Sequence, residues 1–130
     1  MSGILPPSAA TCRSYRLSTY HAASLPVVRV GQRPDDAGLP RRGTVVMLSA
    51  CNPGGRRRTD GWNTRMMARL AHDLRHVPHY PGEGRLGRWS EPLYAVKMGL
   101  APALRLARRY RQNAVVVVRR GQAARLVYLA

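Results

Sequence analysis

The stretch TVVMLSA, residues 44–50, decides how the rest of the chain can fold. It is a continuous apolar run of strand length that follows Gly43 and ends at the breaker cluster CNPGG, residues 51–55. A run that is apolar on both faces is typical of a strand that is covered on both sides. We therefore predict a buried strand here and arrange the other elements around it.

Two amphipathic helices are predicted. The first is capped by Thr59 or Asp60 and runs to about His76, with apolar side chains every fourth residue from Trp62 to Leu74. The second covers residues 100–113, with Pro102 in its first turn and an apolar face opposite four arginines. Each helix has one apolar face, so both are expected to pack on a sheet.

The remaining segments predict short strands and loops. Residues 15–21 are ambiguous, residues 32–43 and 81–92 are predicted loops, and strands are expected at 27–30, 77–80, 93–98, 114–118 and 125–129. The resulting order, β-β-α-β-β-α-β-β, predicts an α+β fold. In it, two main helices pack on one face of a single mixed sheet that ends in a C-terminal β-hairpin. Residues 15–130 are predicted to form one domain, preceded by a disordered or loose segment, residues 1–14.

The charge of the chain is strongly unbalanced. It has 22 Lys and Arg against six Asp and Glu, a net charge of +16, and Lys97 is its only lysine. A positive charge of this size attracts nucleic acid or another polyanion. The same arginine-rich, lysine-poor composition is also what a GC-rich genome produces in any protein. No apolar run is long enough to span a membrane, and two cysteines without metal-type spacing indicate a reducing, cytoplasmic setting.

Both glutamates of the chain lie in the stretch PGEGRLGRWSEP, residues 81–92, on either side of Trp89. In so basic a chain, two carboxylates this close together need a physical reason. We predict that this stretch is a loop that builds a polar cleft. The cleft is completed by amides at a strand end, a helix start and a helix exit: Asn52, Asn63, Gln112 and Asn113.

Two interpretations of Glu83 and Glu91 stay open. Either carboxylate could act as a general base, or the two could hold a metal. Alternatively, each accepts backbone hydrogen bonds or pairs with an arginine, which is the reading favoured for Glu91 because it precedes a proline. For Glu83, between two glycines, the catalytic and structural readings are equally supported.

Other motifs give weaker indications. Arg56, Arg57 and Arg58 precede a helix start and could bind an anion, although a solvated basic loop is the commoner outcome. The spacing of His72, His76 and His79 does not match a zinc signature. Cys51 is predicted to be a buried thiol. Neither a metal nor a cofactor is therefore predicted.

Five motifs occur in an order that resembles the domain of unknown function 3293 family: LSACNP (48–53), WNTRMMARLAHDL (62–74), PGEG (81–84), RWSEP (88–92) and RQNAVVV (111–117). The resemblance covers roughly residues 15–127 and implies a small bacterial cytoplasmic α+β protein of unassigned activity. It also implies that the polar positions are Asn52, Asn63, Glu83, Trp89, Glu91, Gln112 and Asn113. Cys51 and the three arginines depart from the family's usual pattern.

Three functions remain open from the sequence. The first is binding of an anionic ligand or nucleic acid through the basic surface, and the second is hydrolysis or group transfer that uses Glu83 or Glu91. The third is a protein-interaction module without catalysis, which an exposed apolar patch would indicate.

Overall fold

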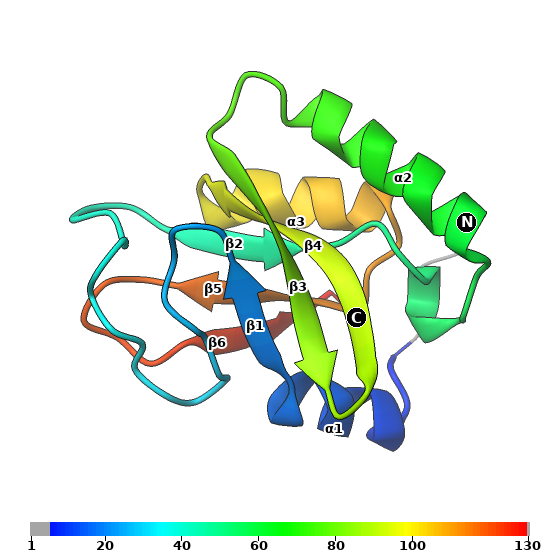
Figure 1. The fold of residues 1–130 in the computed structure, drawn as a ribbon, viewed down its shortest axis with the longest axis horizontal. Helices are drawn as coiled ribbons and strands as arrows, with labels where there is room; N and C mark the ends of the chain where they lie inside the picture. The colour runs from blue at the N-terminus through cyan, green and yellow to red at the C-terminus, as the bar shows by residue number, and fades with distance from the viewer. Residues whose placement is uncertain (1–5, 130) are drawn as a thin grey trace.

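A computed structural model describes residues 6–129 as a curled six-stranded sheet with helices on both sides (Figure 1). The strands are β1 (Thr19–Ala22), β2 (Val45–Leu48), β3 (His79–Leu86), β4 (Trp89–Lys97), β5 (Ala114–Val118) and β6 (Arg125–Tyr128). Their order across the sheet is β1-β3-β4-β2-β5-β6, and every paired strand runs antiparallel to its neighbour. The α+β class and the C-terminal hairpin are confirmed, while the sheet is antiparallel rather than mixed.

Strand β2 lies at the centre of this sheet, as the apolar run at residues 44–50 predicted. All four of its residues are buried, and it pairs with β4 on one side and β5 on the other. Because successive side chains of a strand point to opposite faces, Val46 and Leu48 face one layer and Val45 and Met47 face the other. The strand therefore contributes to two separate apolar cores.

Helices α2 (Asp60–Asp73) and α3 (Leu100–Arg109) cover the first face, and this confirms the predicted placement of both helices (Figure 1). Thr59 caps α2, where its side chain accepts a hydrogen bond from the backbone N–H of Trp62. Leu70 of α2 and Leu74, the C-cap of that helix, are fully buried, as are Ala103 and Ala107 of α3. Leucines on one helix and alanines on the other let both helices lie close to the sheet.

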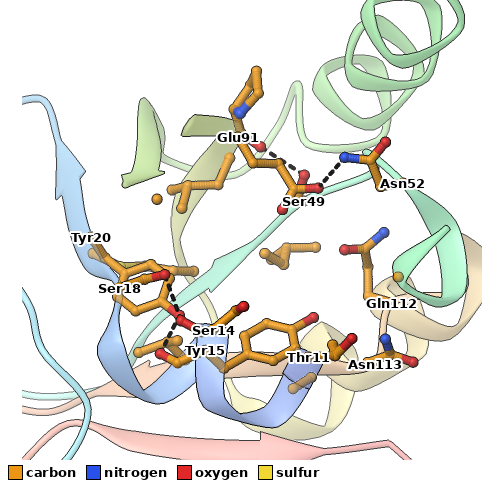
Figure 2. A pocket seen from close by; sticks show the side chains of 18 of the residues that line it. Thr11, Ser14, Tyr15, Ser18, Tyr20, Ser49, Asn52, Glu91, Gln112 and Asn113 are labelled. Carbon is orange, nitrogen blue, oxygen red and sulfur yellow. Dashed lines mark hydrogen bonds between the residues drawn. The ribbon is translucent and has the colours of Figure 1, made fainter. Parts of the chain in front are cut away.

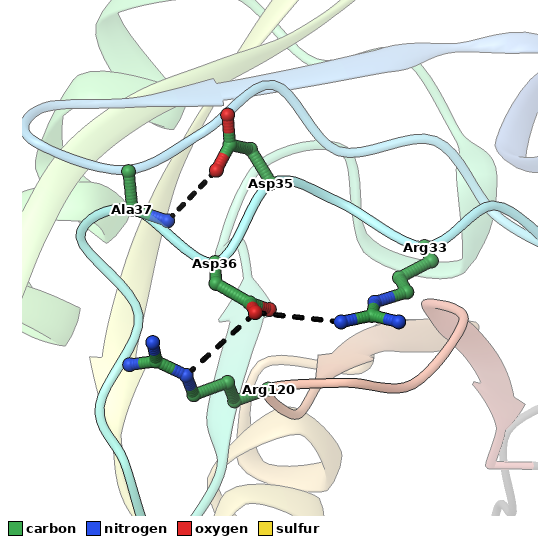
Figure 3. A network of polar contacts seen from close by, with 5 residues as sticks. All are labelled: Arg33, Asp35, Asp36, Ala37 and Arg120. Carbon is green, nitrogen blue, oxygen red and sulfur yellow. Dashed lines mark hydrogen bonds and ion pairs between the residues drawn. The ribbon is translucent and has the colours of Figure 1, made fainter.

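The second face has a thinner cover. Val28 and Leu39, from the long connection between β1 and β2, pack on it, and Val28 also forms an isolated bridge with Tyr20. Figure 3 shows what anchors this connection: the Asp36 carboxylate accepts from Arg33 at 3.4 Å and lies 3.8 Å from the Arg120 guanidinium in the β5–β6 turn. Residues 32–43 are the surface loop that the sequence predicted.

Three segments differ from the sequence predictions. Residues 9–17 form a helix, α1 (Ala9–Leu17), within the segment expected to be loose up to residue 14; residues 1–5 lie outside the described part of the chain. Residues 81–92 belong to the β3–β4 hairpin rather than to a loop, because Gly87, with a φ of 59°, makes a two-residue turn with Arg88. Residues 27–30 contribute only single bridges in place of a strand.

Candidate functional site

A cavity of about 220 Å³ lies on the second face, between α1 and the edge of the sheet where β2 ends and β5 begins (Figure 2). The last pair between these two strands is Met47 with Val116, so the sheet opens beyond Met47. Helix α1 closes the opening with hydroxyl-bearing side chains, while the sheet contributes the apolar floor. The main lining side chains are Thr11, Ser14, Tyr15, Tyr20, Met47, Ser49, Asn52, Arg57, Trp89, Glu91, Leu93, Gln112, Asn113 and Val116.

The register of the β3–β4 hairpin places Glu91 in this cavity. Glu91 pairs with Gly84, and residues directly opposite each other in a hairpin share one face of the sheet. Gly84 also lines the cavity, and the ring of Tyr20 packs so close to it that an added Cβ would lie 3.3 Å from Cε1 of that ring. The missing side chain at Gly84 therefore leaves room for both the tyrosine ring and the carboxylate.

Within residues 6–129, a single hydrogen bond holds the Glu91 carboxylate. Asn52 Nδ2 donates to its Oε1 at 3.2 Å, and no ion pair between the described residues includes Glu91. Burial raises the pKa of Glu91 to about 7, and the Asn52 hydrogen bond offsets only part of this effect. Burial raises the pKa of the Tyr15 and Tyr20 hydroxyls above their usual range, and the charge of Glu91 adds a smaller effect in the same direction.

Asn52 is in turn fixed by Asn63, at the start of α2. Asn63 Oδ1 accepts from the backbone N–H of Asn52, and Asn63 Nδ2 donates to Asn52 Oδ1, each at 3.0 Å. The backbone N–H of Arg58 donates to the same Oδ1 at 2.9 Å. Asn52 has a φ of 47°, a left-handed conformation that asparagine tolerates better than most residues. Asn63 therefore acts on the cavity only through Asn52.

Gln112 and Asn113 lie on the opposite wall. Gln112 Nε2 donates to the backbone carbonyls of Cys51 and Tyr110 at 3.0 and 3.1 Å, and its Oε1 points into the cavity (Figure 2). Asn113 is 2% exposed, and its Oδ1 has no hydrogen-bond partner within residues 6–129. Buried amide oxygens without partners are rare in folded proteins, and this one has almost no surface open to the cavity.

Glu83 lies elsewhere. It precedes Gly84 in the strand and therefore points to the other side of the hairpin. There it forms an ion pair with Arg85 beside an open depression that includes His21. The two glutamates thus do not share a cavity, and Glu91, rather than Glu83, is the one without a cationic partner.

Arg56, Arg57 and Arg58 take different positions. Arg57 lines the cavity, Arg58 lies 5.3 Å from the ring of Trp62, and Arg56 is exposed. The backbone N–H groups of Gly54, Gly55 and Arg56 donate to carbonyls within the protein. They are therefore not free to bind an anion, and this leaves Arg57 as the cationic side chain next to the cavity.

Cys51 and His79 do not line the cavity. The Cys51 thiol is buried, and burial raises its pKa to about 11, which makes it a poor nucleophile near neutral pH. No group of three or more His, Cys, Asp and Glu within the described residues could hold a metal ion. His79 packs edge-on against Tyr94, with ring centroids 5.3 Å apart.

The sequence analysis missed the contribution of α1, above all Thr11, Ser14 and Tyr15. One signal could have revealed this helix: Ser8 precedes two alanines, and its side chain accepts from the backbone N–H of Thr11, as an N-cap residue does. Ser49 was missed as well, since it lies within an apolar run; its hydroxyl donates to the Pro92 carbonyl at 2.7 Å.

None of the helices in residues 6–129 is both long and apolar enough to cross a bilayer. No curated protein and no solved structure gave a match to the chain. Residues 48–115 match the model of the family described as Protein of unknown function (DUF3293), a span that runs from the end of β2 to the start of β5. This span is more than half of the chain and includes Asn52, Glu91 and Gln112, so the protein belongs to this family.

Proposed function

We propose that this protein binds a small polar molecule in the cavity under α1, with Glu91 as the group that holds it. One observation carries the proposal: a half-buried carboxylate lines the cavity without a cationic partner among residues 6–129, in a chain with 22 basic residues. Withdrawing an unpaired charge from water is costly, and a glutamate with only a structural role would be expected to pair with an arginine, as Glu83 does. Asn52 and Asn63 position Glu91, and Trp89, Gln112 and Asn113 contact the ligand.

The two glutamates provide a matched test. Ligand-observed NMR would compare the wild type with Glu91→Gln and Glu83→Gln, using benzamidine, benzoate, adenine and glucose as probes. We expect at least one probe to bind the wild type and Glu83→Gln, with affinity for Glu91→Gln lower by about tenfold or more. Equal binding to all three proteins, or no binding of any probe, would overturn the proposal.

A catalytic role for the same cavity is the second candidate, and the pKa of Glu91 favours it. A carboxyl group with a pKa of about 7 can both accept and donate a proton near neutral pH, as hydrolysis or group transfer requires. The test uses p-nitrophenyl esters, phosphates and glycosides across the pH range around neutrality. We expect a rate that depends on one ionisation near pH 7 and that disappears in Glu91→Gln but persists in Glu83→Gln. An equal rate in both variants contradicts the candidate.

Association with polyanions is supported by a different feature, the charge of the outer helical surface. Arg105, Arg108, Arg109 and Arg111 are all exposed on or just after α3. Contacts between arginines and phosphates release counterions, so duplex DNA should bind with a log affinity that falls by about 0.9 per contact for each unit of log salt. Fluorescence anisotropy of a labelled duplex checks this slope, and Arg105→Glu/Arg108→Glu should weaken binding. Binding that does not depend on salt contradicts this candidate.

A bacterial cytoplasm is the setting we propose. The two free cysteines support the reducing character of this compartment.

A further inference from the structure

We infer, on the basis of the binding function proposed above, that the ligand is a small planar compound with at least two N–H donors on one edge. Amidines, guanidines and amino-substituted heterocycles belong to this class. Some polar atoms of the cavity already have hydrogen-bond partners, and others still face the cavity without one.

The orientation of Gln112 is fixed by its partners. Its Nε2 lies 3.0 Å from the Cys51 carbonyl and 3.1 Å from the Tyr110 carbonyl, and both carbonyls need a donor. Exchanging the amide oxygen and nitrogen would place an acceptor against two acceptors. The atom that faces the cavity is therefore the oxygen Oε1, an acceptor (Figure 2).

The orientation of the Asn52 amide is fixed in the same way, and this leaves Glu91 as a second acceptor. Asn52 Oδ1 accepts from the Arg58 backbone N–H at 2.9 Å, so its Nδ2 must be the atom that donates to Glu91. That bond occupies Glu91 Oε1, while Oε2 has no partner within residues 6–129. Two acceptors, Oε2 of Glu91 and Oε1 of Gln112, thus face the same space from opposite walls, and a ligand satisfies both only if it offers two donors.

Shape and charge point to the same class. Tyr15, Tyr20 and Trp89 line the cavity, and aromatic walls favour flat molecules and attract cations such as amidinium groups. At about 220 Å³, the cavity is smaller than the roughly 300–1000 Å³ of most drug-sized ligand sites, so the ligand is small. Arg57 opposes a cation, but its side chain is exposed and its charge is screened by solvent.

The experiment compares two probes of nearly the same shape, benzamidine with two donor groups and benzoate with two acceptor oxygens. Both are titrated into the full chain and into Glu91→Gln and Glu83→Gln, with binding measured by calorimetry. We expect benzamidine to bind the wild type at least about tenfold more tightly than benzoate, and this preference to shrink in Glu91→Gln alone. Amide NMR shifts at Gln112 and Asn113 should locate the probe in the cavity.

The outcomes separate this inference from the proposed function. If benzoate binds as tightly as benzamidine and still depends on Glu91, the cavity binds ligands but the donor-rich class is wrong. If benzamidine, benzoate and adenine all fail to bind, the donor-rich class is also wrong, while glucose can still support the cavity. If Glu91→Gln binds every probe as the wild type does, both ideas fail together.

The pH dependence gives a second readout. The titratable and charged groups that line the cavity with Glu91 or interact with it are Tyr15, Tyr20, Cys51 and Arg57, and burial raises the pKa values of the first three above their usual values. Glu91 is then the group that titrates near pH 7, and only its ionised form is a full acceptor. Benzamidine affinity should fall by up to about tenfold per pH unit below pH 7. A flat or opposite profile overturns the inference.

Discussion

The two faces of the sheet are built from the same strands but end in different structures. On one face, α2 and α3 bring leucines and alanines that fill the layer, and Leu70 and Leu74 are completely buried. On the other face, the covering helix α1 buries no residue of its own and presents hydroxyl groups, so a cavity remains next to Glu91. The second face keeps an apolar core under the β1–β2 connection, so the cavity is confined to the part of that face that the polar helix α1 covers.

Truncating one leucine on each kind of helix should give the largest contrast. Leu70→Ala removes a fully buried side chain from the filled face and should lower the free energy of unfolding by about 2–5 kcal/mol. Leu17→Ala removes a side chain that is 53% exposed on α1 and should change the free energy of unfolding by less than about 0.5 kcal/mol. Urea denaturation of both variants checks this. Similar losses in the two would mean that α1 is as tightly packed as α2.

Removing the charge of Glu91 should stabilise the open face above neutral pH. Burial raises the pKa of this carboxyl to about 7 from an ordinary value of 4.5, so the folded state holds the proton more tightly than the unfolded chain. Wild-type stability should therefore fall as pH rises from about 4.5 to 8, and Glu91→Gln should gain up to about 3 kcal/mol at pH 8 and nothing at pH 4.5.

Chemical denaturation at several pH values measures this effect, with Glu83→Gln as the control. Glu83 pairs with Arg85 at the surface, so its variant should show no comparable gain at pH 8. A wild type as stable at pH 8 as Glu91→Gln would mean that the carboxylate is better solvated than its burial indicates.

Removing the N-cap of α2 or of α1 should give a smaller difference in stability between the two faces. Thr59 caps α2 and Ser8 caps α1, each by accepting a backbone N–H from its own first turn. Thr59→Ala should lower global stability by about 1 kcal/mol, because α2 must be formed for the filled core to exist. Ser8→Ala should lower it less and should instead speed amide exchange within α1, which can open locally. Equal global losses would contradict this difference.

Breaking the ion pairs that anchor the β1–β2 connection should have the smallest effect on stability. Asp36→Asn removes the charge that Arg33 and Arg120 share and should cost at most about 1 kcal/mol at low salt, with little effect near 1 M salt. Asp35→Asn is the matched control, since Asp35 only accepts a backbone N–H from Ala37 (Figure 3). A loss that persists at high salt would show that packing, rather than charge, holds the connection.

Much of the fold could be predicted because apolar periodicity is a local signal. The run at residues 44–50 and the repeat in α2 each indicate their own element without reference to the rest of the chain. The β3–β4 hairpin was missed because glycines and prolines in residues 81–92 suggested a loop, although a Gly-Arg pair between two alternating segments is also a turn signal. Which glutamate enters the cavity depends on strand register, a pairing between distant residues that no single segment reveals.

The turn at Gly87 and Arg88 has a consequence for how this site could change during evolution. Side chains alternate between faces, so one inserted residue in that turn would shift the pairing of β4 by one position and move Glu91 to the outer side. Its apolar neighbours Leu93 and Ala95 would change sides at the same time, and the core would resist that exchange. The length of a two-residue turn thereby ties the inward position of one acidic group to the foldability of the whole chain.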